Sequence, residues 1–478
     1  MSKKLLLLLT ATLFLSGCTK KENKKVENEN PVFTPRFQVT KTNDSVENDT
    51  DKPKEPSTNG LQIPDSKYEE IIKKSLVTKG NNYLVKQVLS KMRAGEEVIV
   101  STIGGSVTEG AGPSDFHQGY AYQFKDLFIE KYATDKDRVK FIPAGIGGTP
   151  SPMGLVRYQK DVVVPGGRNP DLLIIEFAAN DWLECSNTRA MEYLVRNALE
   201  HDTAVIILYA AATYTNQQGQ ISPVANFYNL PQVSISDGLF NSGVNQEKDS
   251  KIYYSDYVHP TRYGHTYMAK CIMNLIDEID ASQTDAKYEI PATYKNENAF
   301  KTFATVYSNT DDKNVSIKAG AFSKKDDAIQ GYMHGGKCFP ENWYKEGPST
   351  GSGTAGTSSG TVGTSSETAG APTEASGTAG EATVTSAPNN EPFTMTLNCK
   401  SLIMIYKNAN NDSFGKADVF VDGKLQKTYA GHEDGGWNNC MIVMIIDEQK
   451  SAPHTVEIKM AQGDEDKAFT ILAFGYAQ

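Results

Sequence analysis

Basic residues are in deficit in this 478-residue chain, where 48 Lys and Arg stand against 58 Asp and Glu, a formal net charge of −10. No basic patch with interleaved aromatic residues offsets this balance, which argues against a nucleic-acid partner. Cysteine is scarce as well: the chain has six, and their spacing matches no zinc-binding motif. We therefore expect neither nucleic-acid binding nor a metal site.

The chain also lacks an apolar run long enough to cross a membrane. Its longest, Leu5 to Leu15, is too short to span comfortably. It follows a short basic start and precedes Leu15-Ser-Gly-Cys18, which resembles a bacterial lipobox. We expect residues 1–18 to be a lipoprotein signal peptide, cut before Cys18, with lipid added to that cysteine. The mature protein is then expected outside the cytoplasm, anchored by this lipid to the bacterial cell membrane.

Removal of Cys18 as the lipid site leaves an odd number of cysteines. At least one of them is then free or pairs between chains. Cys185 and Cys271 lie in apolar contexts and are expected in the core. The five are Cys185, Cys271, Cys338, Cys399 and Cys440.

Composition divides the rest of the chain into unequal parts. Residues 19–62 are rich in Lys, Asn, Glu, Thr and Pro, cannot bury enough apolar surface to fold, and are expected to form a disordered tether. Residues 63–284 and 285–478 are expected to form two domains. A tract at 346–390, nearly all Ser, Thr, Gly, Ala, Pro and Glu, interrupts the second. We expect it to loop out of that domain, because the entropy of loop closure rises slowly with length.

Apolar strands alternate with helical patterns in the first domain, which predicts an α/β fold with a parallel sheet flanked by helices. A helical pattern spanning 66–94 comes first. Strands are then predicted at 97–103, 138–143, 171–177 and 204–210, with helices near 119–132, 152–162, 187–200 and 261–279.

Short alternating segments with turn residues mark the second domain as an all-β sandwich. Asp422-Gly423 lies between two such segments and predicts a hairpin turn. Other strands are expected at 301–307, 315–320, 393–397, 401–406, 416–421, 454–459 and 468–474.

A serine and a distant Asp-His pair carry the chemistry of the first domain. Ser106 follows Gly104-Gly105 at the end of an apolar strand, and Asp256 lies three residues before His259. A serine hydroxyl needs a base, which imidazole supplies near neutral pH. A carboxylate bonded to the other ring nitrogen holds the imidazole in one tautomer. We therefore predict Ser106, His259 and Asp256 as nucleophile, base and orienting acid.

Two further strand ends offer groups that could stabilise an oxyanion. Gly145 follows the strand at 138–143, and a glycine there can present its N–H to a substrate. Asn180 follows the strand at 171–177, and its side-chain amide is a second donor. Asp181 and Trp182 come next and are candidates for substrate contact. His265 is expected to be structural, and Glu109 a polar residue of a helix start; His117 and His201 have no companion motif.

The segments that contain Ser106, Gly145, Asn180 and His259, in this order along the chain, resemble the four sequence blocks of the SGNH family, also called the GDSL esterases and lipases. The resemblance covers about residues 90–280 and implies that Ser106 is the nucleophile. It implies an oxyanion hole of the Ser106 N–H, Gly145 and Asn180. The sequence departs from the family pattern at Gly105, Pro143 and Ala179, none of which removes a catalytic group.

The second domain resembles the jelly-roll domain of some two-domain carbohydrate esterases, through Lys416–Gly423 and Gly435–Trp437. In those relatives the esterase domain usually comes second, whereas here it comes first. Trp343, Tyr344 and Trp437 could stack on sugar rings or pack the edge of the sandwich.

Together these resemblances imply a serine esterase that removes acyl groups, above all acetyl, from carbohydrate without a cofactor. The alternatives are a lipase or lysophospholipase, a peptidoglycan O-acetyl esterase, and a glycan-binding lipoprotein without catalysis. The sequence leaves the acyl group, the polymer and the oligomeric state open.

Overall fold

The computed structural model describes residues 65–181, 187–212, 216–241, 252–296, 300–347 and 390–478. The predicted signal peptide, the tether, Trp182, Cys185 and nearly all of the predicted insertion lie outside these residues. In the described part, no helix has the length and apolarity needed to cross a bilayer.

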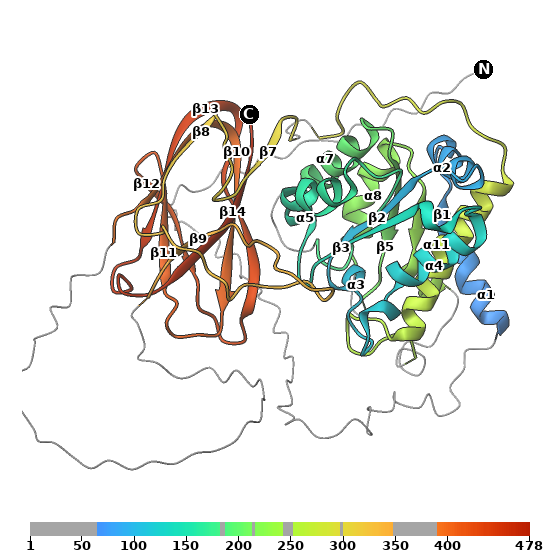
Figure 1. Cartoon of the computed structure of the whole chain (residues 1–478), viewed down its shortest axis with the longest axis horizontal. Helices are drawn as coiled ribbons and strands as arrows, with labels where there is room; N and C mark the ends of the chain where they lie inside the picture. Colours follow the sequence, from blue (N-terminus) through green and yellow to red (C-terminus); the bar gives the residue numbers. More distant parts are fainter. Residues whose placement is uncertain (1–64, 182–186, 213–215, 242–251, 297–299, 348–389) are drawn as a thin grey trace, which may run out of the picture. The chain divides into compact units, whose positions relative to one another are not determined.

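The first domain is built on a six-stranded sheet in the order β1-β6-β5-β4-β2-β3 (Figure 1). Strands β2 to β6 run parallel, and β1 pairs antiparallel with β6 at the edge. The predicted α/β fold is therefore confirmed, with one antiparallel edge strand added to the parallel sheet. The strands are β1 (Leu76–Thr78), β2 (Val98–Gly104), β3 (Val139–Gly145), β4 (Leu172–Glu176), β5 (Ala204–Tyr209) and β6 (Gln232–Ser234).

Helices cover both faces of this sheet, which explains the continuous apolar strands. On β4, Leu172 and Ile174 pack on one face with α2, α4 and α11, while Leu173 and Ile175 face α5, α7 and α8. The helices are α1 (Asp65–Lys74), α2 (Tyr83–Arg93), α3 (Ser106–Glu109), α4 (Tyr120–Tyr132), α5 (Ser151–Tyr158), α6 (Val164–Gly166), α7 (Asn187–Leu199), α8 (Gln218–Phe227), α9 (Ile235–Asn241) and α11 (Arg262–Ala281).

The helical pattern predicted over 66–94 is wrong at its centre. Strand β1 and a turn divide it into α1 and α2, because β1 pairs with β6, about 155 residues further along the chain. Gly80 has φ of 50°, and a Cβ there would lie 2.3 Å from the Leu230 carbonyl carbon, so only glycine fits this turn. Nonlocal pairing has overridden local helical spacing here.

The second domain is an all-antiparallel β-structure of eight strands. Two long strands, β10 and β13, pair along almost their whole length, and each bends at register shifts, near Ser401 in β10. The first half of β10 also pairs with β8, and its second half with β14. The predicted all-β domain is confirmed. Its strands are β7 (Phe303–Val306), β8 (Val315–Lys318), β9 (Trp343–Lys345), β10 (Phe393–Ala409), β11 (Lys416–Val421), β12 (Lys424–Ala430), β13 (Trp437–Met460) and β14 (Phe469–Ala477).

The hairpin predicted at Asp422-Gly423 joins β11 to β12. Both residues have positive φ, 51° and 75°, as a two-residue type I′ turn requires. Four cysteines of the described residues, Cys271, Cys338, Cys399 and Cys440, are buried free thiols, so the prediction that Cys271 is a core residue is confirmed.

An apolar cluster joins the two domains. The core on the α5 and α7 side of the sheet continues into Ile403, Ile405 and Leu472 of the β-domain. Across the same contact, the Arg189 guanidinium of α7 makes two 2.8 Å hydrogen bonds to the Asp447 carboxylate of β13. The β-domain is thus packed on the α/β domain through apolar and charged contacts.

Candidate active site

Ser106 is the first residue of α3, directly after β2 and the Gly105 linker. It lies at the carboxyl end of the sheet, where the sites of open parallel sheets form. The two preceding glycines are needed for space. A Cβ at Gly104 would lie 2.1 Å from the Thr108 hydroxyl oxygen, and one at Gly105 would lie 2.0 Å from Asn180 Oδ1. The predicted turn is therefore real, and its glycines let α3 and Asn180 close around Ser106.

His259 and Asp256 lie on the loop before α11. The backbone of this loop closes on itself, with the Ser255 N–H donating to His259 O over 2.9 Å. Thr261 caps α11 by accepting the Gly264 N–H. These bonds hold the imidazole toward α3, so that His259 Nε2 lies 2.9 Å from Ser106 Oγ.

The other ring nitrogen of His259 lies 2.7 Å from Asp256 Oδ2. Asp256 Oδ1 accepts the backbone N–H groups of Val258 and His259, each at 2.7 Å. Partial burial raises the pKa of Asp256, but the His259 side chain and these two N–H groups outweigh it and lower the pKa to about 2. The carboxylate is therefore ionised throughout the neutral range. The structure brings the three predicted residues together although Ser106 and His259 are 153 positions apart.

Asn180 follows β4 and is buried beside the nucleophile. Its Oδ1 occupies the space that a side chain at Gly105 would need. Its backbone N–H donates to Phe177 O in a tight turn, which directs the side chain toward Gly105. The structure therefore places Asn180 beside Ser106, where the sequence predicted an oxyanion donor.

Gly145 occupies a different place from the one predicted. It is the last residue of β3, and it is buried under α3, since a Cβ there would lie 2.2 Å from Glu109 N. Its role is to let α3 pack on the strand end. Among the described residues, the N–H of Gly148 has no hydrogen-bond partner, and Gly148 is partly exposed. This makes Gly148, rather than Gly145, the candidate glycine donor.

Asp181 does not line the site. It is 1% exposed, and its carboxylate accepts the Ser151 N–H over 2.7 Å at the start of α5. Burial raises its pKa to about 8, above the value of an ordinary aspartate. The prediction of substrate contact by Asp181 is therefore wrong, because the tight turn after β4 directs its side chain inward.

His265 is structural, as predicted. It is completely buried, its Nδ1 accepts the Tyr120 N–H, and its Nε2 lies 3.0 Å from Ala111 O. Burial lowers its pKa to about 4, so it stays neutral near pH 7. Glu109 is no solvated helix residue: it is 7% exposed, and its Oε2 accepts the Gly147 N–H over 2.7 Å.

Two residues of the second domain, Gln330 and Trp437, lie beside the Gly147-Gly148 turn and were not predicted there from the sequence. Gln330 Nε2 donates to Gly147 O over 2.8 Å. The Trp437 ring lies within 3.6 Å of where side chains of Gly147 and Gly148 would begin, and the residue is 40% exposed. In the sequence Trp437 follows two glycines, but no local pattern connects it to the Gly147-Gly148 turn.

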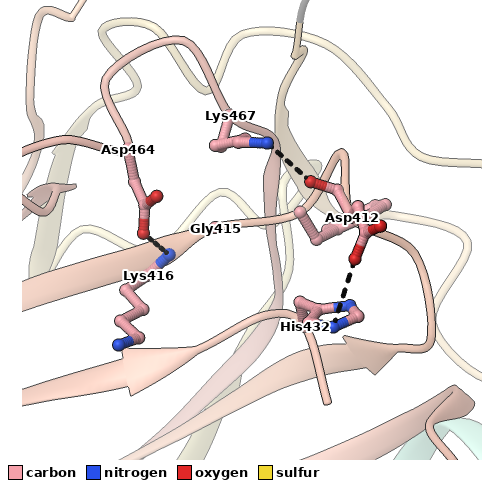
Figure 2. Close-up of a pocket in the computed structure, with 7 residues that line it drawn as sticks. Asp412, Gly415, Lys416, His432, Asp464 and Lys467 are labelled. Carbon is pink, nitrogen blue, oxygen red and sulfur yellow. Dashed lines mark hydrogen bonds and ion pairs between the residues drawn. The ribbon is translucent and has the colours of Figure 1, made fainter. Parts of the chain in front are cut away.

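A separate hollow of about 460 Å³ lies in the β-domain and shares no residue with this site (Figure 2). Two of the charged side chains around it bond to the backbone: Asp464 Oδ2 accepts the backbone N–H of Lys416, and Lys467 Nζ donates to the backbone oxygen of Asp412. Across the described residues, no group of three or more His, Cys, Asp or Glu is arranged to hold a metal ion.

Comparison with known proteins gives one family and several similar folds. Residues 102–267 match the GDSL-like lipase/acylhydrolase family. No curated protein matches the chain significantly.

Among solved structures, a two-domain esterase (CEX) active on acetylated mannans is similar over 85% of this chain and 98% of its own, with 20% identity and a TM-score of 0.64. The same esterase co-crystallised with mannopentaose gives 0.62. An acetylxylan esterase, Axe2 from Geobacillus stearothermophilus, is similar over 41% of this chain and all of its own, with 16% identity and a TM-score of 0.32. The first two likenesses show that both domains share a known two-domain fold.

Proposed function

We propose that this chain, whose residues 102–267 match the GDSL-like lipase/acylhydrolase family, is an esterase that removes acetyl groups from carbohydrate through an acyl-enzyme on Ser106. One observation carries this proposal. Ser106 Oγ, His259 and Asp256 form a continuous chain of hydrogen bonds, 2.9 Å and 2.7 Å long.

In the first half-reaction, His259 Nε2 takes the proton of Ser106 Oγ as the oxygen attacks the ester carbonyl. The C=O bond opens to a tetrahedral oxyanion. When the oxyanion collapses, the bond to the sugar oxygen breaks, and His259 returns the proton to that leaving alcohol. Asp256 stays ionised and stabilises the imidazolium between the two transfers.

In the second half-reaction, water attacks the acetyl-Ser106 ester and gives its proton to His259. Collapse of the second oxyanion releases acetic acid and restores the Ser106 hydroxyl. The oxyanion would be held by the N–H of Ser106, the side chain of Asn180 and the N–H of Gly148.

A carbohydrate substrate is supported by what surrounds the triad. Tyr257, two residues before His259, is 47% exposed, and Trp437 is 40% exposed beside the Gly147-Gly148 turn. Exposed aromatic rings near a catalytic group offer flat faces on which the C–H face of a sugar ring can pack. The two-domain esterase with a similar fold is itself active on acetylated mannans.

Acetate release tests this proposal. Full-length protein and the Ser106→Ala variant would be given acetylated glucomannan, acetylated xylan, O-acetylated peptidoglycan and a long-chain 4-nitrophenyl ester. We expect acetate from a plant polysaccharide with the wild type and none with the variant. Acetate release from peptidoglycan alone would make the protein a peptidoglycan O-acetyl esterase, and activity on the long-chain ester alone would make it a lipase. A folded wild type that is inactive on all four would overturn the enzymatic proposal in favour of glycan binding.

We further propose that the protein is lipid-anchored through Cys18 outside the cytoplasm, on the strength of the Leu15-Ser-Gly-Cys18 motif. Metabolic labelling with a palmitate analogue, followed by fractionation, tests it. The wild type should carry label in the membrane fraction, and Cys18→Ala should not. Equal labelling of the two would contradict the proposal.

A further inference from the structure

The turn that follows β3 is of a kind whose central peptide can adopt either of two orientations. Gly147 and Gly148 are its central residues, and the Thr149 hydroxyl donates to Ile146 O across it. Gly148 has φ of 70° while the φ of Gly147 is not positive, which is the pattern of a type II turn. Types I and II differ mainly by a flip of the central peptide, and glycine tolerates both. The orientation of this peptide must therefore be set by its contacts.

The central peptide carries the C=O of Gly147 and the N–H of Gly148. In a trans peptide these two groups point in opposite directions, so a contact that fixes one also directs the other. Gln330 Nε2 donates to Gly147 O over 2.8 Å. The preceding peptide is fixed too, because the Gly147 N–H donates to Glu109 Oε2 over 2.7 Å.

The two side chains that bind this turn, Gln330 and Glu109, are both held in place by the second domain. Gln330 belongs to that domain, is 4% exposed, and accepts the Cys440 N–H of β13 at its Oε1 over 3.0 Å. Glu109 belongs to α3, but its Oε1 accepts the Met333 N–H over 2.8 Å. The carboxylate thus bridges the glycine turn and the segment Gly331–Lys337, which we name the docking hairpin because a bridge pairs its two ends.

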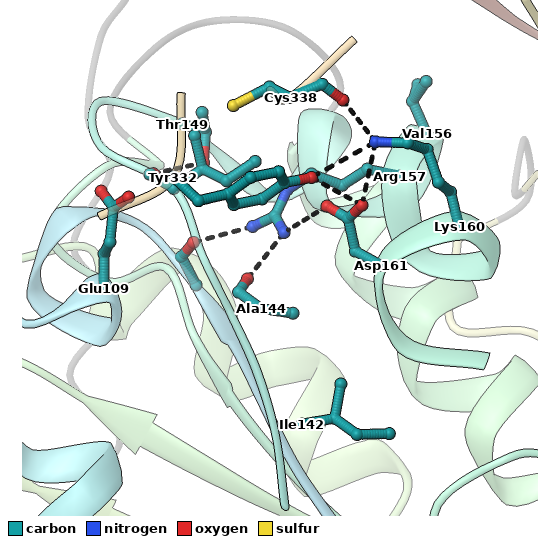
Figure 3. Close-up of polar contacts among 12 residues, drawn as sticks. Glu109, Ile142, Ala144, Thr149, Val156, Arg157, Lys160, Asp161, Tyr332 and Cys338 are labelled. Carbon is teal, nitrogen blue, oxygen red and sulfur yellow. Dashed lines mark hydrogen bonds and ion pairs between the residues drawn. The ribbon is translucent and has the colours of Figure 1, made fainter. Parts of the chain in front are cut away.

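Partly buried polar contacts fix the docking hairpin on the α/β domain (Figure 3). The Tyr332 hydroxyl donates to Asp161 Oδ1 over 2.7 Å, and Lys160 Nζ donates to Cys338 O over 2.5 Å. Asp161 is paired with Arg157, whose completely buried guanidinium also donates to Gly104 O and Ala144 O, at the ends of β2 and β3. The hairpin and the catalytic strand ends are therefore parts of one hydrogen-bonded network.

We propose that Gln330 and the Met333 N–H are positioning groups supplied by the β-domain, which orient the Gly147–Gly148 peptide so that the Gly148 N–H faces the oxyanion. This inference rests on the esterase function proposed above. Neither group touches the reacting atoms. Ester hydrolysis by the α/β domain then requires the docked β-domain, even for a substrate too small to reach it.

Two variants remove the proposed contacts in the full-length protein. Gln330→Met keeps the length of the side chain but loses the donor to Gly147 O. Met333→Pro removes the N–H that binds Glu109. Gly335 N–H donates to Tyr332 O, so Met333 is the second residue of a β-turn, a position that favours proline. The matched control is Met333→Ala, because the Met333 side chain is 47% exposed and the N–H is kept.

Hydrolysis of 4-nitrophenyl acetate is the readout, with the pre-steady-state burst counting active sites and circular dichroism following the fold. Loss of one oxyanion donor costs about 10²–10³ in kcat, so a peptide that is only partly misoriented should lower kcat roughly 10- to 100-fold per active site. We expect this fall in Gln330→Met and in Met333→Pro, with KM changed less than about threefold. Met333→Ala should stay within about twofold of the wild type.

Folded Gln330→Met and Met333→Pro proteins with wild-type kcat per active site would overturn the inference. The inference would also be overturned if the variants gave less folded protein while the folded fraction kept the wild-type kcat. That result would show that the two groups only stabilise the fold. Should Gln330→Met fail to fold, the Met333 pair decides. Failure of the proposed esterase function can be distinguished from failure of this inference. An inactive wild type or a fully active Ser106→Ala variant would show the former, and both are measured before any positioning variant is made.

Discussion

Replacement of Asp256 by Asn tests how His259 is oriented. Asn keeps one side-chain oxygen for the Val258 and His259 N–H groups, which now bind Asp256 Oδ1. In place of Oδ2, which lies 2.7 Å from His259 Nδ1 in the wild type, Asn presents an NH₂ group to that ring nitrogen. The favoured tautomer then carries its proton on Nε2 and cannot accept the proton of Ser106. The loop should stay folded while the base is disabled.

The size of the effect follows from the exposure of the carboxylate. In a serine protease with a buried aspartate, the same change lowers kcat about 10⁴-fold. The side chain of Asp256 is 45% exposed, so water can solvate the alternative tautomer and screen the lost charge. We therefore expect a smaller fall in kcat, about 10²- to 10³-fold, which corresponds to roughly 3–4 kcal/mol in activation free energy.

The assay is kcat for 4-nitrophenyl acetate at pH 8 in full-length protein. Asp115→Asn is the matched control, because the Asp115 carboxylate makes a similar 2.8 Å contact with the exposed His117, which is no part of the triad. The control should behave as the wild type. A kcat of Asp256→Asn within tenfold of wild type, with a full burst, would refute the reasoning and require another group to orient His259.

Three further predictions follow from buried groups and from the rim of the site. Arg157→Met removes the buried partner of Asp161, which keeps Lys160 at 3.4 Å, and also removes the donor to Gly104 O and Ala144 O. It should lower the unfolding free energy by about 3–5 kcal/mol in urea melts, whereas the exposed Arg93→Met control should cost under about 1 kcal/mol. Equal urea midpoints for the two would contradict this. Burial raises the pKa of Glu176 from 4.5 to about 7, so its stabilising protonation is lost as pH rises through 7; between pH 5 and 8 the wild type should lose about 2–3 kcal/mol more stability than Glu176→Gln. Parallel pH–stability curves would exclude it. Trp437→Ala should raise KM for an acetylated polysaccharide several-fold and leave 4-nitrophenyl acetate unaffected, and an equal effect on both substrates would rule out sugar contact.

Much of the catalytic layout was predictable from local sequence. Apolar strands of the right length, each followed by glycine or a small residue, placed Ser106 and Asn180 at strand ends on the same edge of the sheet. The Asp256–His259 spacing fixed their contact within one turn, because only two residues separate them and this limits how far apart the side chains can lie. These features depend on neighbours within a few residues, and such neighbours are visible in the sequence.

Two site predictions and one helix prediction needed correction because contacts with distant parts of the chain decide them. Gly145 looked like an exposed glycine until α3 packed on it, and Asp181 looked like a pocket residue until the turn after β4 buried it. The split of the 66–94 pattern depended on pairing with β6. Packing of α3 on Gly145, the bond from the Ser151 N–H to Asp181 and the pairing of β1 with β6 decided what local propensity left open.

The sequence by itself determined the α/β and β domains, the nucleophile, and the acid–base pair, because strand periodicity and short-range spacing record them directly. Only the tertiary structure decided that Gln330 reaches the Gly147-Gly148 turn and that the Met333 N–H reaches Glu109, which binds this turn. Gln330 is 183 positions from Gly147, and a backbone N–H exists at nearly every residue. Because nearly every residue has a backbone N–H, this donor leaves no signal in the sequence. The packing of the two domains determines that the Met333 N–H meets the Glu109 carboxylate.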